Sequence, residues 1–128
     1  MIRFRRTEPA DIARYLSGWI AQDPKHRGQD ASFYAVTGKG ISCFAVEHDG
    51  EPVMFVREED AGEDVVLHIQ FAPFNRKSVV AALAEGYPLV ANDARERGYK
   101  RVRFESNSPA LIRVMLQMGF LAQLVAEL

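Results

Sequence analysis

A histidine and a short basic run near the middle of the chain are the residues best placed to do chemistry. His68 lies in the apolar run VVLHIQFA (65–72), and Arg76, Lys77 and Ser78 follow shortly afterwards. A histidine titrates near neutral pH and can accept a proton, and cations with a hydroxyl at a helix start can hold an anion. These residues are therefore candidates for a general base and an anion site. The structural alternatives are a hydrogen-bonded histidine and a solvated helix cap.

The remaining histidines, the cysteine and the arginines suggest no further site. His26, His48 and His68 are far apart in sequence and lack metal-ligand spacing, so no metal site is expected. Cys43 is the only cysteine, which excludes an internal disulfide, and in an apolar strand it is expected to be an inert buried thiol. The basic runs 3–6 and 100–103 are interpreted as solvated or salt-bridged faces.

Length and composition indicate one domain spanning residues 1–128. Hydrophobic residues make up 48% and charged residues 26%, which is typical of a folded globular protein. The net charge of −1 argues against a nucleic-acid partner. No run approaches the roughly 20 apolar residues of a membrane span, and the N-terminus is too charged for a secretory signal. A cytoplasmic protein without a membrane partner is expected.

The hydrophobic pattern predicts an α/β fold that positions these residues. Its order is β-α-α-β-β-β-α-β-α-β, a mixed sheet with an antiparallel meander in its first half. Strands are expected at 2–6, 41–47, 52–58, 65–72, 100–105 and 120–128, and helices at 8–21, 30–38, 75–97 and 109–118. Asp49-Gly50 predicts a hairpin, and Pro88 predicts a kink or break in the long helix. Apolar residues on both faces of the strands indicate helices on both sides of the sheet.

Three stretches of the sequence resemble the GNAT superfamily of acyl-CoA-dependent N-acetyltransferases. IRFRRTEPADI (2–12) is similar to the family's first strand and helix start, and IQFAP (69–73) to the end of its fourth strand. VRFESNSPALIRVMLQMGF (102–120) is similar to the fifth strand, the following helix and a closing Gly-Phe. Together these stretches span nearly the whole chain.

The resemblance implies an N-acetyltransferase that uses acetyl-CoA as cosubstrate and an unknown small-molecule or peptide amine as acceptor. In that family a helix start holds the CoA diphosphate, and here the matching residues are Arg76, Lys77, Ser78 and Val79. Phe71 and Asn107, at the ends of the two central strands, are the other implied cofactor contacts. For such a reaction His68, with its titration near neutral pH, is the candidate base.

Two departures from the family pattern leave an alternative open. The diphosphate loop normally contains glycine, but FNRKSVVAAL (74–83) has none. Met115 occupies the place where the family often has a tyrosine proton donor, and its type and spacing indicate a core residue. The alternative is therefore a non-catalytic GNAT-fold module for binding or structure. A short C-terminal strand would also leave an open sheet edge, which predicts a possible homodimer.

Overall fold

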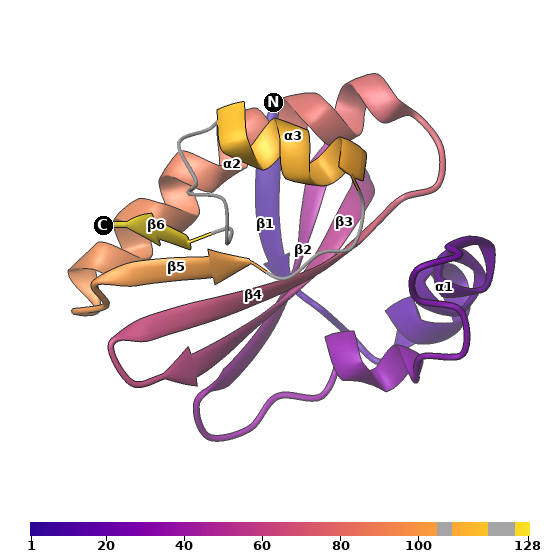
Figure 1. Cartoon of the computed structure of the whole chain (residues 1–128). Helices are drawn as coiled ribbons and strands as arrows, with labels where there is room; N and C mark the ends of the chain where they lie inside the picture. The colour runs from indigo at the N-terminus through magenta and orange to yellow at the C-terminus, as the bar shows by residue number, and fades with distance from the viewer. Residues whose placement is uncertain (105–108, 118–124) are drawn as a thin grey trace.

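A six-stranded sheet forms the centre of the molecule (Figure 1). The computed structural model describes residues 1–104, 109–117 and 125–128. The strands lie side by side in chain order: β1 (Ile2–Arg6), β2 (Ile41–His48), β3 (Glu51–Ala61), β4 (Asp64–Phe71), β5 (Arg101–Phe104) and β6 (Val125–Glu127). All neighbouring pairs are antiparallel except β4 and β5, which are parallel. The predicted α/β class with a mixed sheet and an antiparallel meander is confirmed.

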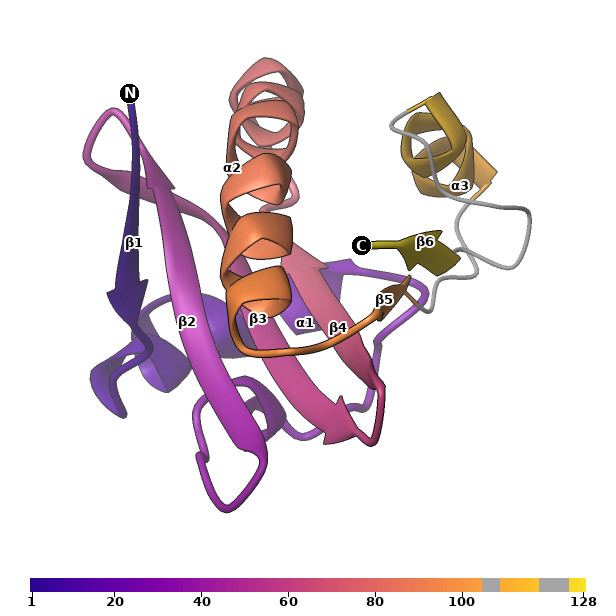
Figure 2. The ribbon, with the colours of Figure 1, turned by 90° about the vertical axis from the view of Figure 1, so that its left-hand side faces the viewer.

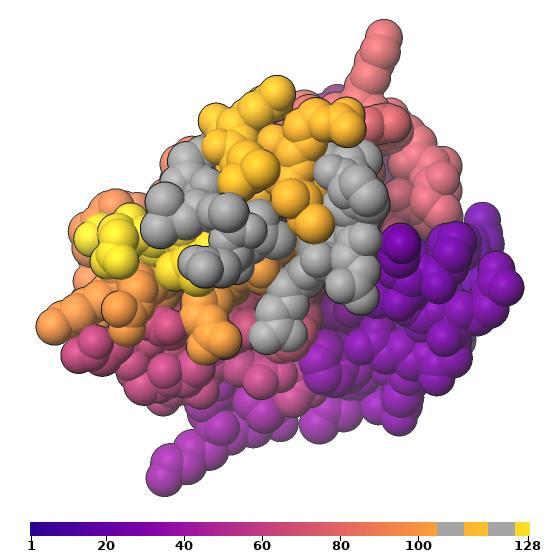
Figure 3. Space-filling model, in the orientation of Figure 1, coloured from indigo at the N-terminus to yellow at the C-terminus, as the bar shows by residue number. Residues whose placement is uncertain are grey.

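Helical segments cover both faces of the sheet, as the apolar pattern predicted (Figure 2). On one face lie α2 (Arg76–Glu96) and α3 (Pro109–Gln117). On the other lie a π-helical turn η1 (Ile12–Leu16), the short α1 (Ser17–Gln22) and a 3-10 turn η2 (Ala31–Tyr34). The space-filling view shows α3 and β6 on one part of the surface and the region around α1 on another (Figure 3). No helix of the described ranges is long and apolar enough to cross a membrane.

Two apolar clusters hold these layers together, one on each face of the sheet. The larger packs α2 and α3 against the strands and includes Val56, Leu67, Ile69, Leu83 and Met115. The smaller packs η1, α1 and η2 against Ala45, Phe55 and Ala72. Val65, Leu67 and Ile69 of β4 belong to the larger cluster, because alternate side chains of a strand share a face. Val66 and Gln70, on the other face of β4, are buried as well.

The turn between β2 and β3 is the hairpin that the sequence predicted. Asp49 and Gly50 both have positive φ, 53° and 87°. This combination is the type I′ geometry that matches the twist of antiparallel strands, and it favours Asp-Gly.

Two helix predictions need correction. The long helix is continuous from Arg76 to Glu96, so Pro88 does not break it. Pro88 has no N–H to donate to the carbonyl of Ala84, four residues earlier. Both residues are exposed, so water can bond to that carbonyl instead. Two residues later, Val90 packs on the main core. The second helix, expected over 30–38, is only the single turn η2. The residues on either side of the last helix, 105–108 and 118–124, lie outside the described residues.

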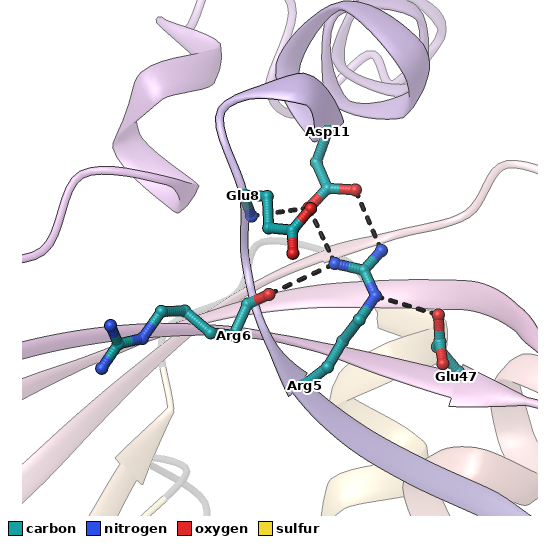
Figure 4. A network of polar contacts seen from close by, with 5 residues as sticks. All are labelled: Arg5, Arg6, Glu8, Asp11 and Glu47. Atoms are coloured by element: carbon teal, nitrogen blue, oxygen red, sulfur yellow. Dashed lines mark hydrogen bonds and ion pairs between the residues drawn. The ribbon is translucent and has the colours of Figure 1, made fainter.

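An ion-pair network fixes the connection from β1 to the first helical segment (Figure 4). Arg5 donates two hydrogen bonds to the Asp11 carboxylate, at 2.8 and 2.9 Å, and its Nε donates to Glu47 at 2.9 Å. Asp11 also accepts the backbone N–H of Glu8 at 2.7 Å. Burial disfavours ionisation of Asp11, but these hydrogen bonds outweigh it and lower the pKa of the carboxyl group. Asp11 is therefore a structural anchor.

Candidate functional site

Among the described residues, β4 extends beyond its pairing with β5, and we call the edge of β4 that this leaves the opening between β4 and β5. The two strands pair only from Asp64 with Arg101 to Leu67 with Phe104, whereas β4 continues to Phe71 along β3. Within the described ranges, β5 therefore provides no partner for residues 68–71.

Backbone donors of β4 face this opening. Ala72 donates its N–H to Val53 on the β3 side at 2.9 Å. In an antiparallel ladder the N–H groups of successive residues point to opposite sides. The N–H groups of Phe71 and Ile69 are therefore directed toward the opening, where they can donate to an extended ligand.

The start of α2 lies directly after this part of β4 and is suited to an anion. The N–H groups of residues 76–78 have no partner within the helix, because the first intrahelical bond runs from Val79 to the Asn75 carbonyl at 3.1 Å. Asn75 itself is left-handed, with φ 55° and ψ 56°, followed by helical residues. A left-handed residue followed by right-handed residues directs successive N–H groups toward one point, where they form a concave site for an anion. A hollow of about 330 Å³ lies here, lined by Ala72, Pro73, Phe74, Asn75, Arg76 and Val79.

Asn75 gives the chain a left-handed turn directly before α2. Asparagine is one of the few residues other than glycine that adopt the left-handed region at low cost. This turn therefore forms without a glycine, although the side chain of Val79 stays at the place where the family pattern has one. Residues 76–79 also contain no carboxylate that would repel an anion.

The predicted cofactor contacts occupy different positions around this helix start. Arg76 and Lys77 are exposed at its mouth, and Ser78 is half-buried. The side chain of Val79 packs against both apolar clusters, and its N–H is already used. Phe71 packs against the main core on the same face of the sheet. Asn107 lies outside the described residues.

His68 lies on the opposite face of β4 from α2, so the structure does not bring it to the helix start. Its Nε2 is 3.4 Å from Glu59, and its ring meets Phe33 edge-on at 5.1 Å between centroids. Arg57 is its cross-strand neighbour and donates to Glu59 at 2.7 Å. The guanidinium of Arg57 also stacks over the Phe33 ring at 4.1 Å.

A second polar group on this face was missed in the sequence. Gln70 is only 1% exposed, and its Oε1 lies 2.6 Å from Nδ1 of His26. Its Nε2 donates to Asp23 at 3.1 Å and to the Phe71 carbonyl at 2.9 Å. Because an amide oxygen only accepts, Nδ1 of His26 carries a proton and donates it to Gln70. An amide inside the apolar run HIQF was the signal that could have indicated a buried partner.

Three buried groups can be assigned structural roles. Met115 is 1% exposed within the main core, which confirms its interpretation as a core residue. Burial raises the pKa of the Cys43 thiol, consistent with an inert thiol. Burial and the Asp23 carboxylate raise the pKa of Tyr34 to about 12, although a hydrogen bond to Gln29 opposes this rise. The phenol of Tyr34 therefore stays protonated at neutral pH.

The arrangement of strands and helices recurs in solved acetyltransferase structures. The GNAT domain of S. lividans PAT superposes with a TM-score of 0.70 at 21% identity, covering 99% of this chain and 90% of that one. The ribosomal-protein-S18-alanine N-acetyltransferase from Escherichia coli gives 0.65 at 19%, covering 94% and 78%. Aminoglycoside acetyltransferase AAC(6')-Ib, in complex with coenzyme A, gives 0.70 at 13%, covering 94% and 84%.

The chain has the GNAT fold. No protein-family model and no curated protein sequence matches it. At these identities the solved structures establish the fold alone. The recognition of a GNAT fold from the sequence is thereby confirmed.

The residues of this GNAT-fold chain fit the cosubstrate that the family uses. The diphosphate of acetyl-CoA needs backbone donors, positive charge and a close approach to the helix start. Unbonded N–H groups, Arg76, Lys77 and the left-handed Asn75 meet these needs. The free edge of β4 offers further donors for the extended arm of the molecule.

Proposed function

We propose that this chain is an N-acetyltransferase that transfers the acetyl group of acetyl-CoA to an amine. The observation that carries the proposal is the opening between β4 and β5 directly beside an anion-suited helix start. The names of two structural neighbours, an S18-alanine N-acetyltransferase and an aminoglycoside acetyltransferase, support the reaction class.

The helix start and the free edge of β4 would hold acetyl-CoA. The N–H groups of residues 76–78 would donate to the diphosphate, with Ser78 as a further donor and Arg76 and Lys77 supplying charge. The N–H groups of Phe71 and Ile69 would donate to the arm and to the thioester oxygen. Bound acetyl-CoA supplies an acyl group activated as a thioester. The side chain of Val79 would form an apolar wall of this site.

Proton removal from the amine is assigned to His68, on the face of β4 that α2 leaves free. Its Nε2 lies beside Glu59, which would orient the ring and stabilise the protonated form. His26 is the second candidate because Gln70 holds its tautomer and position. Comparing the transfer rates of His68→Ala and His26→Ala would decide between them. The acceptor, a small-molecule or peptide amine, would approach from this face, and Asn107 stays a predicted contact.

Calorimetric titration with acetyl-CoA is the first test, with ATP as a control for phosphate binding alone. We expect micromolar affinity, and a rise in unfolding free energy of about 2.7 kcal/mol at a hundredfold excess over Kd. Desulfo-CoA should also bind, because the diphosphate contacts do not involve sulfur. Absence of binding up to millimolar acetyl-CoA would contradict the proposal.

A non-catalytic module is the second candidate, and the buried position of Met115 favours it. With a thioether in the core, this position of α3 offers no proton donor for the leaving thiolate. The two functions share the acetyl-CoA site and differ in turnover. Release of free thiol from acetyl-CoA across a panel of amines would support the enzyme, and binding without any release would support the module.

The edge of β6 suggests self-association. Val125–Glu127 pairs with β5 along one side, and the described residues provide no strand for its other side. We propose that a second copy covers this edge in a homodimer. Light scattering at high micromolar concentration should then give twice the 14.4 kDa chain mass, and a monomeric mass would refute it.

A further inference from the structure

A second hollow lies between the C-terminal half of α2 and the first strands of the sheet. It has a volume of about 540 Å³ and is lined by Phe4, Ser42, Phe44, Glu58, Leu89, Val90, Asp93 and Arg97. We call it the Glu58 hollow. Ligand sites in proteins are typically about 300–1,000 Å³. Figure 2 shows α2 passing beside β1 and β2, the strands that supply part of the lining.

The local packing explains why space remains here. At Gly86 the helix lies against β1, where an added Cβ would make an ordinary contact of 3.5 Å with the Phe4 ring. One turn later Leu89 is 53% exposed, and one of the two β2 residues that line the hollow is the small Ser42. The side chains of the described residues therefore leave this part of the sheet face uncovered.

One side of the Glu58 hollow is apolar and partly aromatic. Phe4 and Phe44 meet edge to face, with ring centroids 5.7 Å apart. Leu89 and Val90 form the opposing helix wall. Exposed apolar surface gains free energy when a ligand covers it. This side fits a hydrocarbon or aryl group.

The other side has an excess of negative charge. Glu58 is 7% exposed and accepts a hydrogen bond from Arg97 at 2.6 Å. Arg97 also lies 3.0 Å from Asp93, so one guanidinium serves two carboxylates. Among the lining residues, one negative charge is left uncompensated. The C-terminal end of a helix adds negative potential, and cations are favoured there.

A smaller polar hollow of about 210 Å³ adjoins the first and extends the acidic surface. The two share Ser42, Glu58 and Arg97 as lining residues, and the smaller one adds Asp60, which lies on the same face of β3 as Glu58. A ligand in the Glu58 hollow would thus have apolar side chains at one end and carboxylates at the other.

We propose that the Glu58 hollow binds a small organic cation with an apolar body, of the class of arylalkylamines. The aryl group would pack against Phe4, Phe44 and Leu89. The ammonium would bind beside the Glu58 and Asp93 carboxylates, whose two negative charges the single Arg97 guanidinium does not fully compensate. This site is separate from the acetyl-CoA site. Leu89 follows Arg76 by 13 positions, about 20 Å along the helix at 1.5 Å per residue.

The test is an amide NMR titration of the whole chain at pH 7 with three probes of similar shape. Phenethylamine carries a positive charge, 2-phenylethanol none and 3-phenylpropionate a negative charge. We expect phenethylamine to shift the amides of residues 42–44 and 89–97 saturably. We expect 2-phenylethanol to bind about tenfold more weakly, because it lacks the charge-assisted hydrogen bond. We expect 3-phenylpropionate not to bind.

Two variants locate the binding. Glu58→Gln should weaken phenethylamine about tenfold. Because that change could disturb folding, Leu89→Lys provides a second test at an exposed helix position, where a cation would compete for the site. Leu116→Lys is its matched control, since Leu116 is a similarly exposed leucine on α3. Only Leu89→Lys should abolish the shifts.

Several outcomes would overturn the proposal. These are no saturable shift at 10 mM phenethylamine, equal binding of the propionate, or shifts that persist in Leu89→Lys. Shifts of the same amides with protein concentration alone would assign the hollow to a second copy of the chain. Acetyl-CoA, titrated separately, should perturb residues 75–79 instead, so either site can fail without the other.

Discussion

The two ends of α2 offer opposite surroundings to a ligand. At its start, unbonded N–H groups lie beside Arg76 and Lys77, and residues 76–79 include no acid. In its last turns, Asp93 and Arg97 face Glu58, and carboxylates outnumber the guanidinium. The helix macrodipole strengthens both tendencies. One helix can therefore favour an anion at one end and a cation at the other.

The largest effect is expected when the charge at the start of α2 is reversed, because this should remove the contrast between its two ends. Arg76→Glu with Lys77→Glu should lower acetyl-CoA affinity about hundredfold, because two charged contacts to phosphate become repulsive. Calorimetry would measure the loss. Phenethylamine affinity should not change.

Lys39→Glu is the control, since Lys39 is an exposed lysine in the loop before β2. It should leave acetyl-CoA affinity unchanged. If the double variant also kept its affinity, the helix start would not be the diphosphate site.

The Arg5–Asp11–Glu47 network is a mostly buried ion-pair network with which the Glu58–Arg97 pair can be compared. Asp11 is 5% exposed, and both of its oxygens accept hydrogen bonds from Arg5. Asp11→Asn should cost about 2 kcal/mol of unfolding free energy in urea, because a mostly buried charge pair loses a partner. Glu51→Gln, at an exposed carboxylate in β3, should cost little.

The loss of unfolding free energy in Asp11→Asn should decrease as pH falls. The folded pKa of Asp11 is lowered, so its contribution to stability is present above the unfolded pKa of about 3.9. It is lost as pH falls through the lower, folded pKa. The difference between wild type and Asp11→Asn should therefore be largest near neutrality and shrink in acid. A difference that stayed constant down to pH 2 would contradict this assignment.

Substitutions of Asn75 test whether the backbone conformation at the start of α2 contributes to anion binding in addition to charge. Asn75→Val should destabilise the fold by about 1.5 kcal/mol, since β-branched residues avoid left-handed φ. It should also weaken acetyl-CoA binding. Asn75→Gly should preserve both, and urea unfolding with calorimetry would measure them. If the glycine variant lost acetyl-CoA affinity, the asparagine side chain would be the essential group.

The sequence predicted the elements of this fold better than their functional surroundings. Alternation and turn chemistry located the strands, and Asp49-Gly50 identified the hairpin. Pro88 does not break α2, because packing along the helix outweighs a local cost of about 3 kcal/mol. The 3.6-residue periodicity of the long helix was the stronger signal.

Long-range pairing explains what could not be predicted at the sites. The distance between Gln70 and His26 depends on a loop that folds back onto β4 across 44 positions. The Glu58 hollow likewise combines residues from three strands and a helix. The left-handed Asn75 was hidden for a different reason, because residues other than glycine rarely adopt that conformation. A search for glycine therefore could not find this left-handed turn.

The smallest expected effect is the loss of unfolding free energy in Glu58→Gln, which compares the Glu58–Arg97 ion pair with the Asp11–Arg5 pair. Glu58 is as buried as Asp11, so burial alone predicts similar losses when each carboxylate is replaced by its amide. However, Arg97 is 41% exposed, and it can keep its contact with Asp93 and gain water. Glu58→Gln should therefore cost less than about 1 kcal/mol in urea unfolding.

The decisive quantity is the ratio of that loss to the loss in Asp11→Asn. A small ratio means that the Glu58 carboxylate contributes little to folding and is available to a ligand. A ratio near one would mean that Arg97 depends on Glu58 as Arg5 depends on Asp11. In that case Glu58 at the C-terminal end of α2 would stabilise the fold instead of binding a ligand. Only the start of α2 would then be a ligand site.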